Sequence, residues 1–165
     1  FGASSNTVIS VRNSLNWAVK MNNLKEVVLF VESPGGAIAP SDEIYSMISS
    51  WKKMRPNVTV SAYFYALAAS GGYYVAMSAD TIASSPTALV GSIGVIFQTY
   101  DLEDMAKKLG IKSNTFKSGQ MKDVGNMFRG ITEEEKDLFN NLVMQSHSHF
   151  IRVVQNGEVG FRAKI

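Results

Sequence analysis

The stretch Glu26-Val-Val-Leu-Phe-Val-Glu-Ser-Pro-Gly-Gly36 contains the two features that decide the fold. Residues Glu26–Val31 form a continuous, β-branched run, which is typical of a buried strand. The run leads into the glycine-bearing turn Ser33–Gly36. A second strand is expected over Val58–Phe64, and glycines follow it too, in Ala68-Ala-Ser-Gly-Gly72. Strands that alternate with helical segments predict an α/β fold.

Helical segments separate and follow these strands. Ser41 is expected to cap a helix whose apolar face includes Ile44 and Ile48. A glycine just after a helix and a Thr-x-x-Glu capping box mark further helix ends. Three further helices are expected. The first starts at Ser70, the second covers Asp101–Leu109 and ends before Gly110, and the third runs from the capping box Thr132–Glu135 to about Gln155.

The bulk composition limits the possible functions. The chain has 165 residues, which fits one domain, and 45% of them are hydrophobic, which fits a globular protein. The net charge is only +2, and no run of Lys and Arg forms a basic stripe, so nucleic acid is not an expected partner. The chain has no cysteine, which excludes a disulfide scaffold and a thiolate metal site. We expect no metal and no cofactor.

No segment resembles a membrane anchor or a signal peptide. The longest apolar run, from Val58 to Ala69, is interrupted by Thr59 and Ser61 and falls short of the roughly 20 residues that cross a bilayer. Phe1 leads directly into a polar, Ser-rich turn. If the protein acts at a membrane, we expect the anchor to lie outside this chain.

Three glycine-bearing turns are candidates for the site: Ser33–Gly36, Ala68–Gly72 and Gly91–Val95. Sites in α/β folds lie at the carboxyl ends of strands, so the first two turns are expected to share one crevice. N–H groups from two such turns can converge on one oxygen and form an oxyanion hole. The alternative is that these glycines simply terminate strands.

Ser70 stands at a strand-to-helix junction, where a serine can be either a nucleophile or an ordinary helix cap. A nucleophilic serine needs a base. His147 and His149 lie two residues apart on one helix and point in different directions, so they make a poor pair. A buried lysine can have its pKa lowered by 3–5 units and act as the base instead. Lys117 and Lys122 are both candidates on these grounds.

Four motifs in order carry a family resemblance: Ser33–Gly36, Ala69-Ser-Gly-Gly-Tyr-Tyr74, Gly91–Val95 and Lys117-Ser-Gly-Gln-Met-Lys-Asp123. Together they resemble the signal peptide peptidase A family of the Clp-protease/crotonase superfamily. The match covers roughly residues 24–135. The resemblance implies a single catalytic domain over residues 1–165, with a repeated β-β-α superhelix.

The resemblance also implies residue roles. Ser70 would be the nucleophile and Lys122 the general base of a Ser-Lys dyad, with Ser92 close to it. N–H groups of Gly36, Ala37 and Gly71 would form the oxyanion hole, although many members have glycine where Ala37 stands. Members of the family are anchored in the bacterial cytoplasmic membrane on its outer face, form ring-like homo-oligomers and degrade apolar signal-peptide remnants.

Longer family members carry an anchor and a first strand before the position of Phe1 and a closing segment after that of Gly157, so this chain is read as trimmed at both ends. Residues 158–165 match no family element. Tyr65, Tyr100 and other aromatic residues near the motifs could line a substrate groove or belong to the core.

Three alternatives remain. The first is a Ser-Lys protease with another membrane-protein substrate. The second is an acyl-CoA enzyme, in which Glu32 or Glu43 would have to supply a carboxylate. The third is a non-catalytic assembly subunit.

Overall fold

The computed structural model describes residues 5–157, which form two compact units. Among the described residues, one unit comprises residues 5–94 and 147–157, and the other comprises Val95–Ser146. Each unit is described by itself below. Residues 158–165, for which the sequence analysis found no family element, lie outside the described residues.

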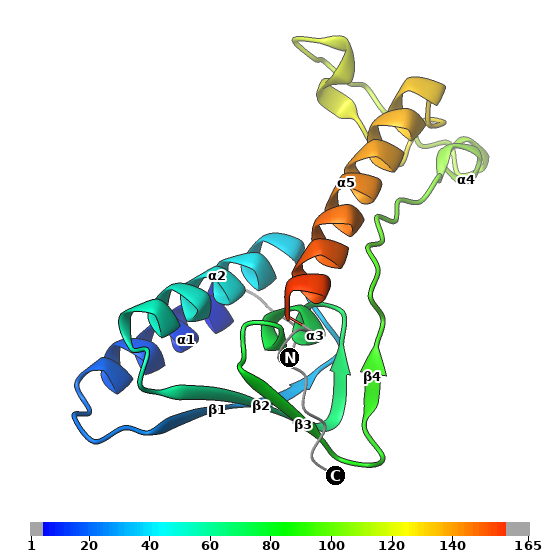
Figure 1. The fold of residues 1–165 in the computed structure, drawn as a ribbon. Helices are drawn as coiled ribbons and strands as arrows, with labels where there is room; N and C mark the ends of the chain where they lie inside the picture. Colours follow the sequence, from blue (N-terminus) through cyan, green and yellow to red (C-terminus); the bar gives the residue numbers. More distant parts are fainter. Residues whose placement is uncertain (1–4, 158–165) are drawn as a thin grey trace. The chain divides into compact units, whose positions relative to one another are not determined.

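The first unit is built on a parallel sheet. Its strands are β1 (Glu26–Ser33), β2 (Thr59–Ala69), β3 (Thr81–Ser84) and β4 (Leu89–Gly91). The order is β1-β2-β3, and β4 pairs with the far end of β2 (Figure 1). Both predicted strands are therefore confirmed, and the second is longer than the predicted Val58–Phe64. All three pairings are parallel, so the turns that follow β1, β2 and β4 lie at the same end of the sheet.

The helices α1 (Ser5–Val19), α2 (Ile38–Met54) and α3 (Gly71–Ala76) cover one face of this sheet (Figure 1). Alternate strand residues point toward them and form two apolar clusters with helical side chains. One cluster includes Phe64 of β2 and joins the sheet to α3 and the C-terminal half of α5 (Glu133–Gly157). The other cluster joins α1 and α2 to the sheet and contains Val8, Leu15, Ala18, Ile44, Ile48, Trp51, Val58 and Val60.

The predicted start of α2 was wrong. Ser41 does not cap this helix, because α2 already begins at Ile38, with Ala37 in extended conformation before it. Ser41 instead lies in the first turn, 3% exposed, and its hydroxyl donates to the Ala37 carbonyl at 2.9 Å. A serine can bond to the carbonyl four residues earlier inside a helix, which the sequence pattern does not separate from capping.

The second unit contains α4 (Glu103–Lys108), the 3₁₀ turn η1 (Gln120–Asp123) and the start of α5. Gly110, two residues after α4, has φ +71°, as predicted for a glycine that ends a helix. The capping box at the start of α5 is also confirmed, since Thr132 and Glu135 each accept from the other's backbone N–H. Among residues 5–157, no helix is both long and apolar enough to cross a membrane.

Candidate active site

The turns after β1 and β2 meet at the end of the sheet, as the sequence predicted. Gly35 has φ +117°, and a Cβ placed on it would lie 2.7 Å from the Cβ of Ser70 and 3.3 Å from the N of Gly71. Such contacts leave no room for a side chain at Gly35. The two turns are therefore in van der Waals contact through the backbone of Gly35 and the side chain of Ser70.

Ser70 has an unusual backbone. Its φ and ψ are 50° and −120°, a sparsely populated region for a residue with a Cβ. It directly precedes α3, yet its side chain makes no capping hydrogen bond to that helix. Its N–H donates to the Gly91 carbonyl at 2.9 Å, and its carbonyl accepts from Tyr74 N at 2.9 Å. No hydrogen bond engages its hydroxyl among residues 5–157. A serine in a strained conformation on a strand-to-helix turn is also found at the nucleophile position of hydrolases.

Two buried or partly buried serines shape the turn after β1. The hydroxyl of Ser33 lies 3.1 Å from Gly35 N, from which it accepts, and a Cβ on Gly72 would come within 2.8 Å of the Cβ of Ser33. A Cβ on Gly71 would overlap the hydroxyl of Ser41. The glycines after Ser70 are thus required by close approach of the neighbouring turn, and not by their own backbone angles.

The predicted oxyanion-hole residues lie on both sides of this contact. Gly36 N is 3.3 Å from the position that a Cβ on Gly71 would take, so the backbones of Gly36 and Gly71 are neighbours. Ala37 has φ −66° and ψ 146°, which any L-residue adopts, so alanine fits here as well as glycine. All three residues belong to the first unit, as Ser70 does.

Ser92 follows the last residue of β4. Ala69 of β2 pairs with Gly91 in parallel register, and Ser70 then donates to the Gly91 carbonyl. Ser92 has φ 54°, close to the value of Ser70, and is exposed. Ser92 and Ser70 therefore each follow the last paired residue of two adjacent strands, β4 and β2.

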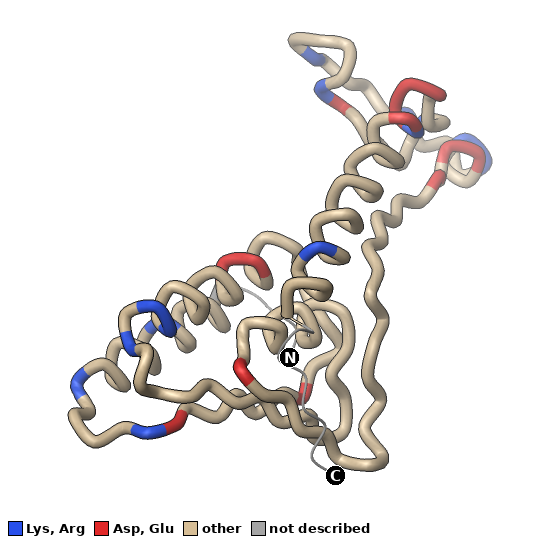
Figure 2. Tube along the Cα trace, viewed as in Figure 1, with Lys and Arg blue, Asp and Glu red and all other residues tan. Residues whose placement is uncertain are grey.

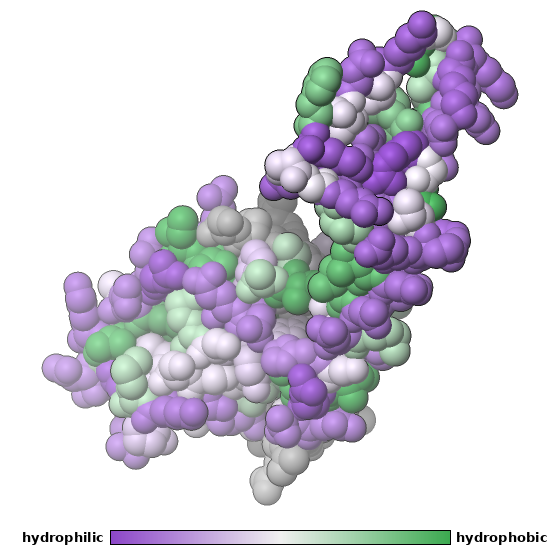
Figure 3. Space-filling view, turned by 90° about the horizontal axis from the view of Figure 1, so that it is seen from above, coloured by the Kyte–Doolittle hydropathy of each residue, from purple (hydrophilic) through white to green (hydrophobic). Residues whose placement is uncertain are grey.

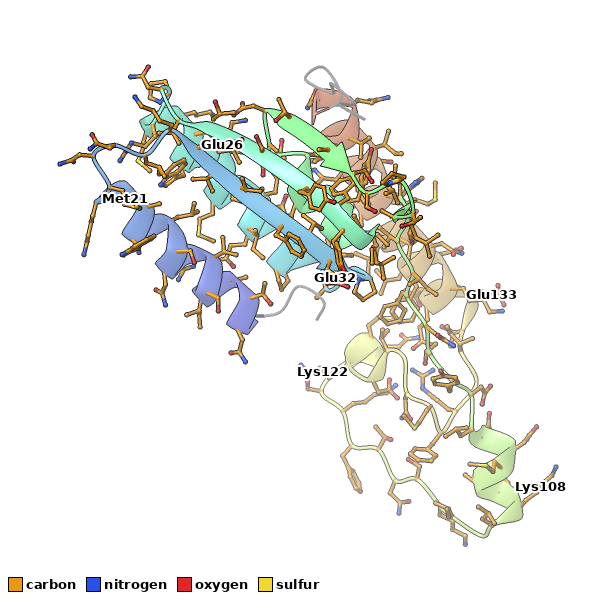
Figure 4. All side chains as sticks on the ribbon, turned by 90° about the horizontal axis from the view of Figure 1, so that it is seen from below. Met21, Glu26, Glu32, Lys108, Lys122 and Glu133 are labelled. Atoms are coloured by element: carbon orange, nitrogen blue, oxygen red, sulfur yellow. The ribbon has the colours of Figure 1, made fainter. Side chains whose placement is uncertain are left out.

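Lys122 belongs to the second unit, on the turn η1, and its side chain is exposed (Figure 4). The other candidate base, Lys117, is engaged. Its Nζ donates to the Gln120 carbonyl at 3.0 Å and to Asp123 Oδ1 at 2.8 Å. No hydrogen bond or ion pair within the described part of the chain engages the Lys122 amine. This difference favours Lys122, because the Lys117 amine is already engaged in an ion pair with Asp123. Lys122 is nevertheless exposed, and not buried as the sequence analysis expected of a lysine base.

An ion network anchors the residue next to Lys122. Arg129 donates to both carboxylate oxygens of Asp123, at 3.0 and 3.1 Å, and to Glu135 Oε2 at 2.9 Å. Hydrogen bonds from Arg129 and then from Lys117 hold the pKa of Asp123 far below its usual range. The hydrogen bond from Arg129, followed by that from Thr132 N, lowers the pKa of Glu135 to about 2. Acidic and basic residues gather accordingly around η1 and the start of α5 in the tube view (Figure 2).

Other candidates take structural or surface positions. Glu43 forms an ion pair with Arg12 at 2.6 Å, and Glu32 lies exposed near the end of β1 (Figure 4). His149 contacts Asp42, with Nε2 3.3 Å from Oδ1. The aromatic residues near the motifs divide between core and surface. Phe64, Tyr73 and Tyr74 are buried, Tyr63 is half-buried, and Tyr65, Phe97 and Tyr100 are exposed.

Sequence reasoning missed three features of this region. It did not identify Gly35 as the glycine in contact with Ser70, although the Pro-Gly dipeptide marked a turn there. It missed the Asp42–Tyr74 hydrogen bond of 2.5 Å, for which an isolated sequence gives no signal. It also missed the ion pairs of Arg129 with Asp123 and Glu135.

Comparison with known proteins places the chain in a family. The sequence profile of Peptidase family S49 matches residues 52–159. The chain is 36% identical over 134 residues to the Enterococcus faecium protein named "Putative signal peptide peptidase SppA" (81% of this chain, 38% of that protein). It is 35% identical over 142 residues to a Methanocaldococcus jannaschii protein named as a protease (86% of this chain, 45% of that protein). It thus spans less than half the length of either relative.

A solved structure confirms the predicted α/β fold. A mutant of a membrane-bound stomatin-specific protease is similar with a TM-score of 0.52 at 16% sequence identity, covering 95% of this chain and 64% of that one. This structural similarity shows the fold alone, whereas the sequence profile and the two relatives identify the family. The chain belongs to peptidase family S49, the signal peptide peptidase A family.

Proposed function

We propose that this chain is the catalytic part of a serine endopeptidase, with Ser70 as nucleophile and Lys122 as general base. The observation that carries the proposal is the backbone of Ser70, whose φ of 50° places the hydroxyl on a strained turn against Gly35. Membership of a peptidase family supports the reaction class. The engagement of Lys117 by Asp123 supports Lys122 as the base.

In the proposed reaction the Lys122 amine takes the proton of the Ser70 hydroxyl as the oxygen attacks the scissile carbonyl. A C–O bond forms, and the carbonyl becomes a tetrahedral oxyanion. Lys122 then gives its proton to the leaving amine, and the C–N bond breaks. Water, deprotonated by Lys122, hydrolyses the acyl-enzyme and restores the Ser70 hydroxyl.

The oxyanion would be bound by N–H groups of Gly36 or Ala37 from one turn and Gly71 from the other. The proximity of Gly36 N to Gly71 supports this pairing. Donors fixed in a backbone need no reorganisation when charge develops, which is why losing one typically costs about 10²–10³ in kcat. Ser92 would orient the lysine amine by a hydrogen bond from its exposed position after Gly91.

The proposed substrates are extended apolar peptides such as signal-peptide remnants. The second unit exposes large apolar side chains among polar ones, including Ile96 at 83% and Phe116 at 96% (Figure 3). We propose that such side chains contact substrate or neighbouring copies in a homo-oligomeric ring. The enzyme would act at the outer face of a bacterial membrane, through an anchor outside this chain.

Labelling with a serine-reactive fluorophosphonate tests the proposal. Wild-type full-length protein should be labelled at Ser70, S70A should not be labelled, and K122A should be labelled far more slowly. A peptide panel should show cleavage after Leu or Ala, little after Lys or Asp, and none in folded proteins. Labelling that persists in S70A would refute the nucleophile. Efficient cleavage at charged sites would refute the substrate class while leaving the dyad intact.

A further inference from the structure

A carboxylate away from the proposed dyad joins three elements of the first unit. Asp42 lies on α2, and its Oδ1 accepts from the Tyr74 hydroxyl of α3 at 2.5 Å. The same oxygen lies 3.3 Å from Nε2 of His149 on α5, in the part of that helix that belongs to the first unit. Arg152, one turn further along α5, lies 3.4 Å from the other ring nitrogen of His149.

The Tyr74 side chain is enclosed by aromatic rings. It is 6% exposed, with Tyr45 and Phe150 packed edge-on at centroid distances of 5.5 and 5.1 Å and His149 stacked at 6.2 Å. Burial, followed by the hydrogen bond to Asp42, raises the pKa of the Tyr74 hydroxyl above its ordinary value. The hydroxyl therefore stays protonated and donates to Asp42 throughout the neutral range.

Each end of the Asp42–Tyr74 bond lies close to one half of the proposed site. Asp42 is in the first turns of α2, which begins two residues after Gly36. Tyr74 is one helical turn after Ser70, and its N–H donates to the Ser70 carbonyl. The bond thus ties the helix that follows the oxyanion turn to the helix that follows the nucleophile. A hydrogen bond depends on direction as well as distance, so it restricts the relative rotation of these two helices more than an apolar contact does.

We propose that Asp42 and Tyr74 are positioning residues, which hold the Gly36 turn in register with Ser70. The inference rests on the proposed function. Neither side chain touches the reacting atoms in this assignment. Their effect is on the distance between the Ser70 hydroxyl and the donors of the oxyanion hole, and a displacement of about 1 Å can lower a rate by about a hundredfold.

Three variants and one control of full-length protein test the inference. Y74F removes only the donor, D42N keeps an acceptor without the charge, and D42A removes both. Y45F is the matched control, because Tyr45 packs on Tyr74 at a ring-centroid distance of 5.5 Å and no hydrogen bond of its hydroxyl occurs within the described part of the chain. Peptidase kcat and KM and the rate of fluorophosphonate labelling are measured well below the melting temperature of each variant.

Positioning predicts a specific pattern. Y74F should lower kcat and the labelling rate by about tenfold while KM changes less than about twofold, and Y45F should match wild type. D42N should recover part of the activity that D42A loses. The double variant Y74F/D42A should be no slower than D42A alone, because both changes break one bond.

Other outcomes overturn the inference. Wild-type kcat in Y74F, or losses that multiply in the double variant, would show that the bond does not position the site. A fall in melting temperature with unchanged kcat would show that it only stabilises the fold. The proposed function stands in these cases if S70A still abolishes labelling. Wild-type protein without labelling at Ser70 would overturn both.

Discussion

Replacing Gly35 with alanine should disable the site without replacing a proposed catalytic residue. The new Cβ would lie 2.7 Å from the Cβ and 3.1 Å from the hydroxyl of Ser70, and φ at this position is +117°. Forcing an L-residue into such a backbone costs about 1–3 kcal/mol, and overpacking typically costs a further 1–3 kcal/mol. The gain from a stiffer unfolded chain offsets only about 0.4–1 kcal/mol of this. We expect G35A to be destabilised by about 3 kcal/mol, a net value within these ranges.

Two assays check this estimate. For a domain of this size about 3 kcal/mol lowers the melting temperature by roughly 6–12 °C, which scanning calorimetry resolves. Fluorophosphonate labelling of Ser70 should slow by at least about tenfold, since the nucleophile must move to relieve the overlap. G94A is the matched control, because a Cβ there meets nothing within 4 Å. G35A that melts and labels like G94A would refute the contact between the two turns.

Three further predictions concern the proposed base, its assistant and the ion network. K122R should abolish turnover, because arginine stays protonated, whereas K117R should retain substantial activity; near-normal peptidase activity in K122R would transfer the role to Lys117. S92A should lower kcat by about ten- to a hundredfold with an unchanged circular dichroism spectrum, and unchanged kcat would make Ser92 structural. The pKa of Glu135 is depressed to about 2 in the folded state, so its ionisation stabilises the fold above the unfolded pKa of about 4.3 and this contribution is lost as the pH falls toward 2. E135Q should therefore show a flatter loss of stability over that range in urea titrations, and identical pH dependence in both proteins would contradict the role of the Arg129 pair.

Much of the fold could be predicted from short sequence patterns, because the start and end of a helix or strand depend largely on residues that are neighbours in the sequence. The β-branched run that became β1, the capping box at Thr132 and the glycine after α4 each depend on neighbours in sequence. The prediction for Ser41 was wrong because a serine near the start of a helix can either cap the helix or donate its hydroxyl to the carbonyl four residues earlier. The sequence contains both possibilities, and the tight packing of Ser41 against Gly71 decides between them.

The candidate site could be predicted only in part from the sequence, because several of its contacts join residues that are distant in sequence. Ser70 and the glycine turns could be named because they lie in recognisable motifs. The contact of Gly35 with Ser70, the bond between Asp42 and Tyr74 and the pairing of Lys117 with Asp123 depend on tertiary packing or on side-chain geometry. Separations such as the 32 residues between Asp42 and Tyr74 carry no periodic signal. Residue type does not distinguish Lys117 from Lys122; the family resemblance favoured Lys122, and the structure adds that Lys117 is paired with Asp123.

The ion network of the second unit has a consequence for how that unit opens. Among its residues 95–146, all of them described, Ala106 is the one buried apolar side chain, whereas Glu135 is buried with its charge paired to Arg129. A segment held by charges and hydrogen bonds, with little apolar burial, exchanges its amide hydrogens through low-energy local unfolding. Amides of η1 should therefore exchange well before those of β2, and should do so faster as salt is added. The order of the turn that carries Lys122 would then depend on the ionic strength of the surrounding solution as well as on the contacts within its own unit.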